Sequence, residues 1–140
     1  MNNNKKAFSL LELLVVILIL GLLAGIVAPQ VIKKGEEAKR DLACVEMKSI
    51  GNALKMFKLD NGGYPDTEEG LNALIKNPDS DKYPNYARNP YIENLPKDSW
   101  GTPFVYIKND SKYELISFAG DRKEGGSDDD EDIFLSKCKK

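Results

Sequence analysis

The apolar and polar positions of this chain follow two patterns, one after the other. Residues 8–28 are apolar at nearly every position, and Glu12 is the one side chain among them that can carry a charge. A helix over this stretch would be about 31 Å long at about 1.5 Å per residue, which matches the hydrocarbon thickness of a bilayer. Because no polar face interrupts the pattern, we predict a membrane-spanning helix here.

The second pattern begins after Pro29, where apolar residues keep to one face. They recur at steps of four and three: Ala43, Met47, Ile50, Leu54 and Phe57. Polar residues take the opposite side: Lys48, Asn52, Lys55 and Lys58. This period predicts an amphipathic helix whose apolar stripe belongs to the core of a small domain. Gly62 and Gly63 are expected to end the helix near residue 61, since glycine adopts left-handed backbone angles without steric cost.

Shorter patterns follow the long helix. Residues 67–75 predict a short helix capped by Thr67, with Leu71, Leu74 and Ile75 facing inward. Residues 77–96 contain four prolines and no sustained period, which indicates an irregular loop held by its tyrosines. Residues 104–107 and 113–118 predict a β-hairpin, and residues 133–135 a last short strand. The expected fold is α+β, a long N-terminal helix with a transmembrane half and an amphipathic half packed on a small antiparallel β-sheet.

Composition excludes several classes of function. The chain has 140 residues, a net charge of −2 and no basic stripe, which argues against a nucleic-acid partner. It contains no histidine, so histidine-dependent triads and histidine-ligated zinc are excluded. Cys44 and Cys138 lie 94 positions apart and form no CxxC or other metal-ligand pattern, and no P-loop is present. About 110 residues remain beyond the apolar helix, enough for one domain.

The start of the chain leaves two points open. Glu12 is costly inside a bilayer unless it is paired, although it could also extend towards the lipid headgroups beside Lys5 and Lys6. The apolar run is longer than the roughly 7–15 residues of a secretory signal, and no small-residue cleavage site follows it. Lysines lie on both sides of the run, so the positive-inside rule does not set the orientation.

The first residues resemble a known processing signature. The segment KKAFSLLELLVVILILGLLAGIVAP is similar to the N-terminus of type IV pilins and pseudopilins. The resemblance implies that a prepilin peptidase cuts between Ala7 and Phe8, that Phe8 is then N-methylated, and that the new amine meets Glu12 of a neighbouring subunit. A buried pair of opposite charges would offset the cost of burying either one alone. The family usually has glycine before the cut, where this chain has Ala7.

Three downstream motifs narrow the resemblance. The segments LDNGGYPDTEEGLNALI, LPKDSWGTPFVYI and ISFAGDRKEGGSDDDEDI resemble, in order, signatures of the major pseudopilins of type II secretion systems. This implies a non-enzymatic subunit of a homo-oligomeric helical filament, assembled through its N-terminal helix. Its implied partners are minor pseudopilins, the inner-membrane assembly platform and the prepilin peptidase. Beyond Ile133 the chain departs from the family, which usually has a tryptophan there.

The resemblance also divides the chain. Residues 1–7 correspond to a leader, residues 8–29 to the transmembrane and filament-core helix, and residues 30–140 to a domain exported to the periplasm from the inner membrane. Two other readings remain open. One is a pilin of a type IV pilus or of a DNA-uptake pseudopilus, which shares the first helix. The other is a membrane-anchored enzyme or sensor, for which we find no nucleophile–base pair and no cofactor motif.

The stretch after Phe118 is strongly acidic. Its cluster comprises Asp121, Asp128, Asp129, Asp130, Glu131 and Asp132. Oxygen ligands and the flexible glycines at positions 125 and 126 suit calcium, although the spacing is not that of an EF-hand. A solvated acidic loop fits the composition equally well. The resemblance implies a Ca²⁺ ion held by Asp121, Asp130, Asp132 and a backbone carbonyl near Phe118, which would pin the loop to the sheet.

The two cysteines form the last candidate feature. In an oxidising periplasm Cys138 of the tail could form a disulfide with Cys44 of the amphipathic helix. The alternative is two unpaired thiols, with Cys44 a small residue near the apolar stripe.

Overall fold

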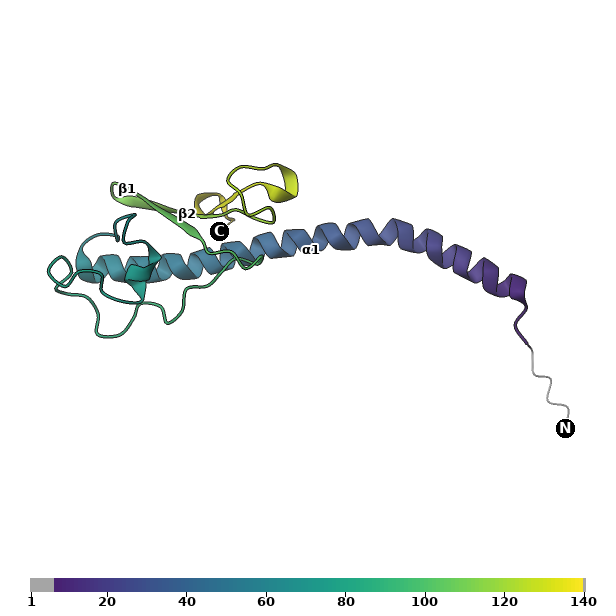
Figure 1. The fold of residues 1–140 in the computed structure, drawn as a ribbon, viewed down its shortest axis with the longest axis horizontal. Coiled ribbons are helices and arrows are strands. Elements are labelled where there is room, and N and C mark those ends of the chain that lie inside the picture. Colours follow the sequence, from purple (N-terminus) through teal and green to yellow (C-terminus); the bar gives the residue numbers. More distant parts are fainter. Residues whose placement is uncertain (1–6, 140) are drawn as a thin grey trace, which may run out of the picture. The chain divides into compact units, whose positions relative to one another are not determined.

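The computed structural model describes residues 7–139 (Figure 1). Its elements are one α-helix, three strands and three short 3₁₀ helices: α1 (Leu10–Asn61), η1 (Leu71–Leu74), β1 (Val105–Asn109), β2 (Lys112–Ser117), η2 (Asp128–Asp130), β3 (Ile133–Phe134) and η3 (Leu135–Lys137). The fold is α+β, as predicted. The chain divides into two compact units, residues up to 36 and residues from 37 onward.

The first unit contains the beginning of α1. Every residue from 7 to 35 is exposed, although most of these side chains are apolar. By length and composition α1 contains a segment able to cross a membrane, with a mean hydropathy of 3.0. Pro29 lies inside the helix and does not end it. The predicted leader, residues 1–7, falls outside the described residues except for Ala7.

The second unit is built on the amphipathic end of α1. All five residues of the predicted stripe are buried with no exposed surface. The predicted polar residues on the opposite side of the helix are exposed. The helix ends at Asn61, and Gly62 follows at φ 80° with its N–H donating to the Lys58 carbonyl at 2.8 Å. Both the stripe and the glycine stop are therefore confirmed.

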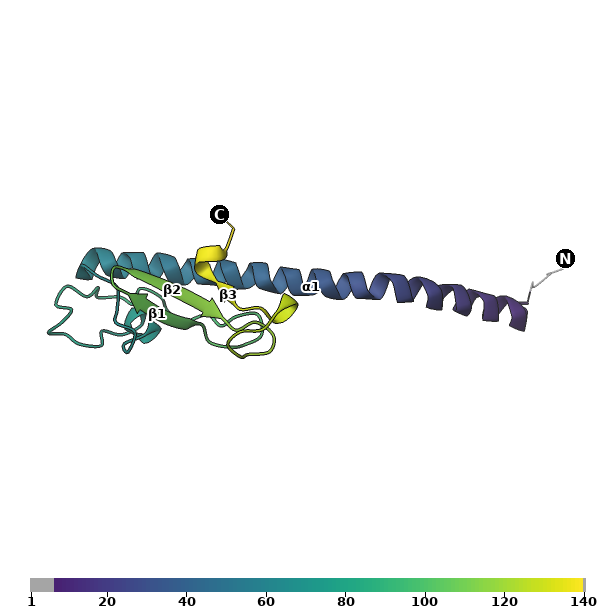
Figure 2. The ribbon, with the colours of Figure 1, turned by 90° about the horizontal axis from the view of Figure 1, so that it is seen from above.

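A three-stranded antiparallel sheet in the order β1-β2-β3 lies in the same unit (Figure 2). The hairpin register runs from Val105 opposite Ile116 to Asn109 opposite Lys112, so a two-residue turn joins the strands. Ser117 at the end of β2 pairs with Ile133 in β3. The last strand is shorter than predicted, because the chain turns into η3 at residue 135.

The segment after α1 differs from its prediction. Instead of a helix over residues 67–75, only the single 3₁₀ turn η1 forms, preceded by Gly70 at φ 61°. Thr67 does not cap it, because its Oγ1 accepts a hydrogen bond from the Lys108 N–H at 3.0 Å. A glycine in a left-handed conformation interrupts the helical geometry, so the first turn expected there is lost.

The proline-rich loop is tied down by tyrosines, as predicted. Residues 77–96 contain neither helix nor strand. The rings of Tyr83, Tyr86 and Tyr91 lie 5.0, 5.9 and 5.3 Å from the ring of Phe57, centroid to centroid. Such edge-to-face and tilted arrangements suit the quadrupoles of aromatic rings. The loop thereby covers the end of the buried stripe.

Candidate functional site

The predicted processing bond lies in an exposed segment just before α1. Residues 7–9 are not helical, and the Phe8 side chain is 82% exposed. The peptide bond between Ala7 and Phe8 is therefore outside any hydrogen-bonded turn of the helix. The cut itself stays a prediction.

Glu12, the predicted assembly residue, takes part in a capping box within its own chain. The Glu12 N–H donates to Ser9 Oγ at 3.1 Å, and the Ser9 N–H donates to Glu12 Oε2 at 3.3 Å. This reciprocal pair satisfies two N–H groups that have no partner inside the helix. The sequence analysis missed it, although the pattern Ser9-x-x-Glu12 signals it.

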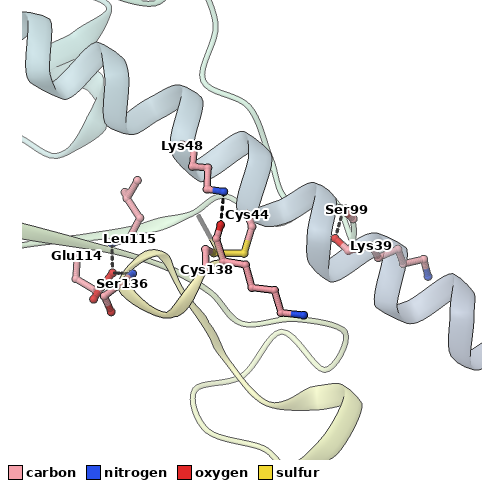
Figure 3. Close-up of a disulfide and its surroundings, with 9 residues drawn as sticks. Lys39, Cys44, Lys48, Ser99, Glu114, Leu115, Ser136 and Cys138 are labelled. Atoms are coloured by element: carbon pink, nitrogen blue, oxygen red, sulfur yellow. Dashed lines mark hydrogen bonds between the residues drawn. A yellow bond between two sulfur atoms is a disulfide. The ribbon is translucent and has the colours of Figure 1, made fainter.

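The structure joins Cys44 of α1 to Cys138 of the tail by a disulfide, with 5.8 Å between the Cα atoms (Figure 3). Polar contacts hold the tail on both sides of the bond. Lys48 Nζ donates to the Lys139 carbonyl, and the Ser136 N–H donates to Glu114 Oε1 at 3.1 Å. In this chain the disulfide and η3 therefore fix the segment that follows β3.

The acidic loop, residues 121–132, is bound to α1 through its backbone. Arg40 Nη1 donates to the carbonyls of Glu131 at 2.8 Å and Asp129 at 3.2 Å. Arg122 Nη2 donates to the Trp100 carbonyl at 2.9 Å. The sequence analysis did not single out Arg40, because nothing local to residue 40 signals a contact about ninety residues away.

A buried carboxylate organises the start of this loop. Asp98 is 5% exposed, and its Oδ1 accepts from the Thr102 N–H at 2.7 Å and the Trp100 N–H at 3.1 Å. Its Oδ2 accepts from the Ser117 hydroxyl at 2.7 Å, and Ser117 Oγ accepts from the Ala119 N–H at 3.2 Å. These bonds connect the turn after Asp98 with the end of β2. The turn-rich sequence around Asp98 indicated the turn but not this connection.

The predicted calcium ligands do not all come together. Among residues 7–139, no three acidic or cysteine side chains form a group that could hold a metal ion. Asp121 is exposed and accepts the Lys123 N–H at 3.0 Å, and Asp130 is exposed in η2. Phe118 is half-buried just beyond β2.

Asp132 is the exception within this loop. It is 8% exposed, and its Oδ2 accepts the Gly125 N–H at 2.9 Å. Its Oδ1 is buried and has no hydrogen-bond partner among the described residues. An unpaired buried carboxylate oxygen is unfavourable unless a cation or a donor reaches it. The oxygen ligands of this loop and the unpaired Oδ1 of Asp132 thus fit a hard cation. The predicted ligands do not all lie together around one site.

A separate ionic cluster lies beside η1. Lys82 Nζ is 2.5 Å from Asp66 Oδ2 and 2.7 Å from Glu69 Oε1, and Lys108 Nζ is 2.6 Å from Asp66 Oδ1. Hydrogen bonds from Lys108 and Lys82 lower the pKa of Asp66 to about 2. Burial, followed by the hydrogen bond to Glu69, raises the pKa of Tyr83 to about 12. The cluster links residues 66–69 to the loop and to β1.

Comparison with known proteins adds independent information. A family model described as "Type II secretion system (T2SS), protein G" matches residues 30–136. A second model, described as "Prokaryotic N-terminal methylation motif", matches residues 2–28. Together they extend over nearly the whole sequence.

Curated relatives and a solved structure agree with these matches. The type II secretion system core protein G of Pseudomonas aeruginosa is 44% identical over 132 residues, 92% of this chain and 93% of the relative. That of Vibrio cholerae is 39% identical over 131 residues, 92% of this chain and 90% of the relative. The crystal structure of the major pseudopilin from the type 2 secretion system of enterohaemorrhagic Escherichia coli is similar, with a TM-score of 0.64 and 29% identity over 72% of this chain and 85% of that one.

The match over residues 30–136 lies in the domain that follows the apolar helix, and so does not rest on the first helix alone. The chain therefore belongs to the type II secretion system protein G family.

Proposed function

We propose that this chain is the major structural subunit of a periplasmic pseudopilus that drives protein export, anchored in the inner membrane before assembly. The observation that carries the proposal is the first half of α1, where every residue from 10 to 35 is exposed. An apolar surface of this extent is stable only in lipid or against other apolar surfaces. Family membership supports the same function, which is structural and not catalytic.

Assembly would proceed by transfer of this helix from lipid to a bundle of like helices. A prepilin peptidase would cut between Ala7 and Phe8, and Phe8 would be N-methylated. The Phe8 amine would then pair with Glu12 of a neighbouring subunit, in place of the capping contact with Ser9. Repeated head-to-tail contacts that do not close give a helical filament. Minor pseudopilins and the inner-membrane assembly platform would be its partners.

The role of Glu12 can be separated from its capping contact. Glu12→Gln keeps a side chain that can complete a capping box but removes the charge, whereas Ser9→Ala removes the capping partner and keeps the charge. We expect Glu12→Gln to lower filament yield at least tenfold and Ser9→Ala to leave most of it. Yield is measured in filaments sheared from cells expressing the full chain, and mass spectrometry reports the cut and the methyl group. Normal yield from Glu12→Gln would contradict the proposed ion pair.

We also propose that the acidic loop binds a Ca²⁺ ion through Asp121, Asp130 and Asp132 with the Phe118 carbonyl. The support is the buried, unpartnered Oδ1 of Asp132 and the purely oxygen-based ligand chemistry of the loop. Bound calcium would neutralise closely spaced carboxylates. The ion and its ligands would hold the loop against the end of β2 and against Arg40.

Calcium binding is tested by thermal unfolding of the full chain in detergent, with calcium or with a chelator. At a calcium concentration of 100 times the dissociation constant, the folded state gains about 2.7 kcal/mol. Asp132→Asn should abolish the difference in melting temperature. Asp128→Asn is the matched control, because it removes one charge from the same loop but no assigned ligand. Equal melting temperatures of the unaltered chain in both conditions would leave a solvated acidic loop.

A further inference from the structure

A basic groove runs along the hairpin end of the second unit. Two adjoining surface hollows of about 290 and 330 Å³ share Tyr64 and Ser111. Four lysines border them: Lys55, Lys58, Lys108 and Lys112. Two carboxylates also border them, Asp110 and Glu114. Cations outnumber anions in this groove, and the Tyr64 ring forms part of its wall.

Most of this positive charge is not neutralised within the chain. Lys108 pairs with Asp66, and Lys58 Nζ lies 4.7 Å from the centroid of the Tyr64 ring. Lys55 and Lys112 are exposed and have no ion-pair partner in the part of the chain that the structure describes. The groove thus presents cations that an acidic partner could use.

The acidic loop has the opposite character. Residues 121–132 contain seven carboxylates against two cations. Arg40 binds the backbone carbonyls of Asp129 and Glu131 and not their carboxylates. Both residues are exposed, and neither has an ion-pair partner within residues 7–139. Neither is an assigned calcium ligand, so calcium would leave both carboxylates available.

The turn between β1 and β2, whose Asp110 and Ser111 border the groove, and the acidic loop lie at opposite ends of the sheet in the second unit (Figures 1 and 2). The loop is bound at Arg40 of α1, and the groove is bordered by Lys55 and Lys58 of the same helix. These positions are about 22–27 Å apart along the axis, at about 1.5 Å per residue. The loop of one chain therefore cannot enter its own groove.

We propose that the acidic loop of one copy docks in the basic groove of a second copy displaced by about 22–27 Å along the helix axis. The two surfaces differ, so the contact is heterologous and repeats from copy to copy without closing. Opposite charges at the two ends of the unit steer the approach and disfavour a reversed copy. The inference deepens the proposed function and rests on it, because only an assembled filament brings the copies into this register.

Cross-linking tests the contact in filaments of the full chain. A carbodiimide joins an amine to a carboxylate only when the two touch. We expect a covalent dimer on a denaturing gel, with mass spectrometry joining Lys55, Lys58 or Lys112 to Asp129 or Glu131. The separation within one chain makes such a link intermolecular. Filaments that cross-link through other pairs alone would overturn the inference while leaving the proposed function intact.

Charge reversal provides the second test. Lys55→Glu with Lys112→Glu should lower filament yield several-fold, and so should Asp129→Lys with Glu131→Lys in an otherwise unaltered chain. Combining all four changes should restore the yield, because each groove then meets a basic loop. Lys76→Glu, an exposed site outside the groove, is the matched control and should assemble normally.

The outcomes of charge reversal are distinct. Wild-type yield from both double variants would overturn the docking contact, and the loop variant decides the matter should the groove variant fail to fold. Absence of filaments from the unaltered chain in its secretion system would instead overturn the proposed function, and this inference with it.

Discussion

The two halves of α1 have the same secondary structure and opposite surroundings. In the first half Leu22 and Ile26 are 66% and 65% exposed, whereas in the second half Leu54 and Phe57 are completely buried. The buried residues of the helix all lie between Ala43 and Phe57. The apolar side chains in the second half of the helix are thus buried by their own unit. Those in the first half stay exposed within theirs.

The difference shows where each half obtains its stability. Burying a large apolar side chain contributes about 1.5–3 kcal/mol, and the second half gains this from the sheet and loops around it. The first half buries none of its apolar side chains within its own unit. The second unit thus has a core of its own, whereas the stability of the first half of α1 depends on what surrounds it.

The largest expected effect comes from opening the disulfide, which fastens the tail to the second half of α1. Closing a loop with a sequence separation of 94 is worth about 4–5 kcal/mol in the chain-entropy model. We expect reductant to lower the free energy of unfolding of the full chain in detergent by about that amount, as measured with urea. The variant with both Cys44→Ser and Cys138→Ser should not respond to reductant. Two alkylatable thiols in native, unreduced protein would contradict the bond.

A core substitution sharpens the contrast within a single helix turn. Phe57→Ala should destabilise the second unit by about 3–5 kcal/mol, because it removes a fully buried ring packed on three tyrosines. Leu59→Ala, two positions later and 79% exposed, should change stability by less than about 0.5 kcal/mol. Denaturant unfolding of the full chain measures both. Similar losses from the two variants would contradict the expectation that a side chain on the buried face of α1 contributes more to stability than one on its exposed face.

The smallest expected effect is a pH dependence confined to the second unit. The pKa of Asp66 falls from 3.8 to about 2 on folding, so its contribution is complete above the unfolded value and is lost as pH falls through the folded one. Stability should therefore decline between about pH 4 and pH 2, and Asp66→Asn should flatten that decline. Asp81→Asn, at an exposed position outside the ionic cluster, should leave it in place. Added salt should weaken the effect, since the cluster is partly exposed.

Several features followed from the sequence because they depend on neighbours along the chain. The stripe from Ala43 to Phe57, the stop at Gly62, the hairpin and the irregular loop all express local periodicity or backbone preference. The capping box of Ser9 and Glu12 was equally local and was overlooked. The resemblance in the N-terminal segment and three motifs indicated the family, which the comparisons confirm.

Other features were decided only by tertiary structure. Thr67 was expected to cap a helix, yet its hydroxyl accepts the Lys108 N–H of a strand forty-one residues later. Arg40, Asp98 and Ser117 each connect segments that are distant in sequence. Calcium ligation by the acidic loop stays a prediction, because it requires several carboxylates of the loop to lie around one ion. Local pattern determines which elements form, whereas pairing of single polar groups depends on which distant segments the buried core brings together.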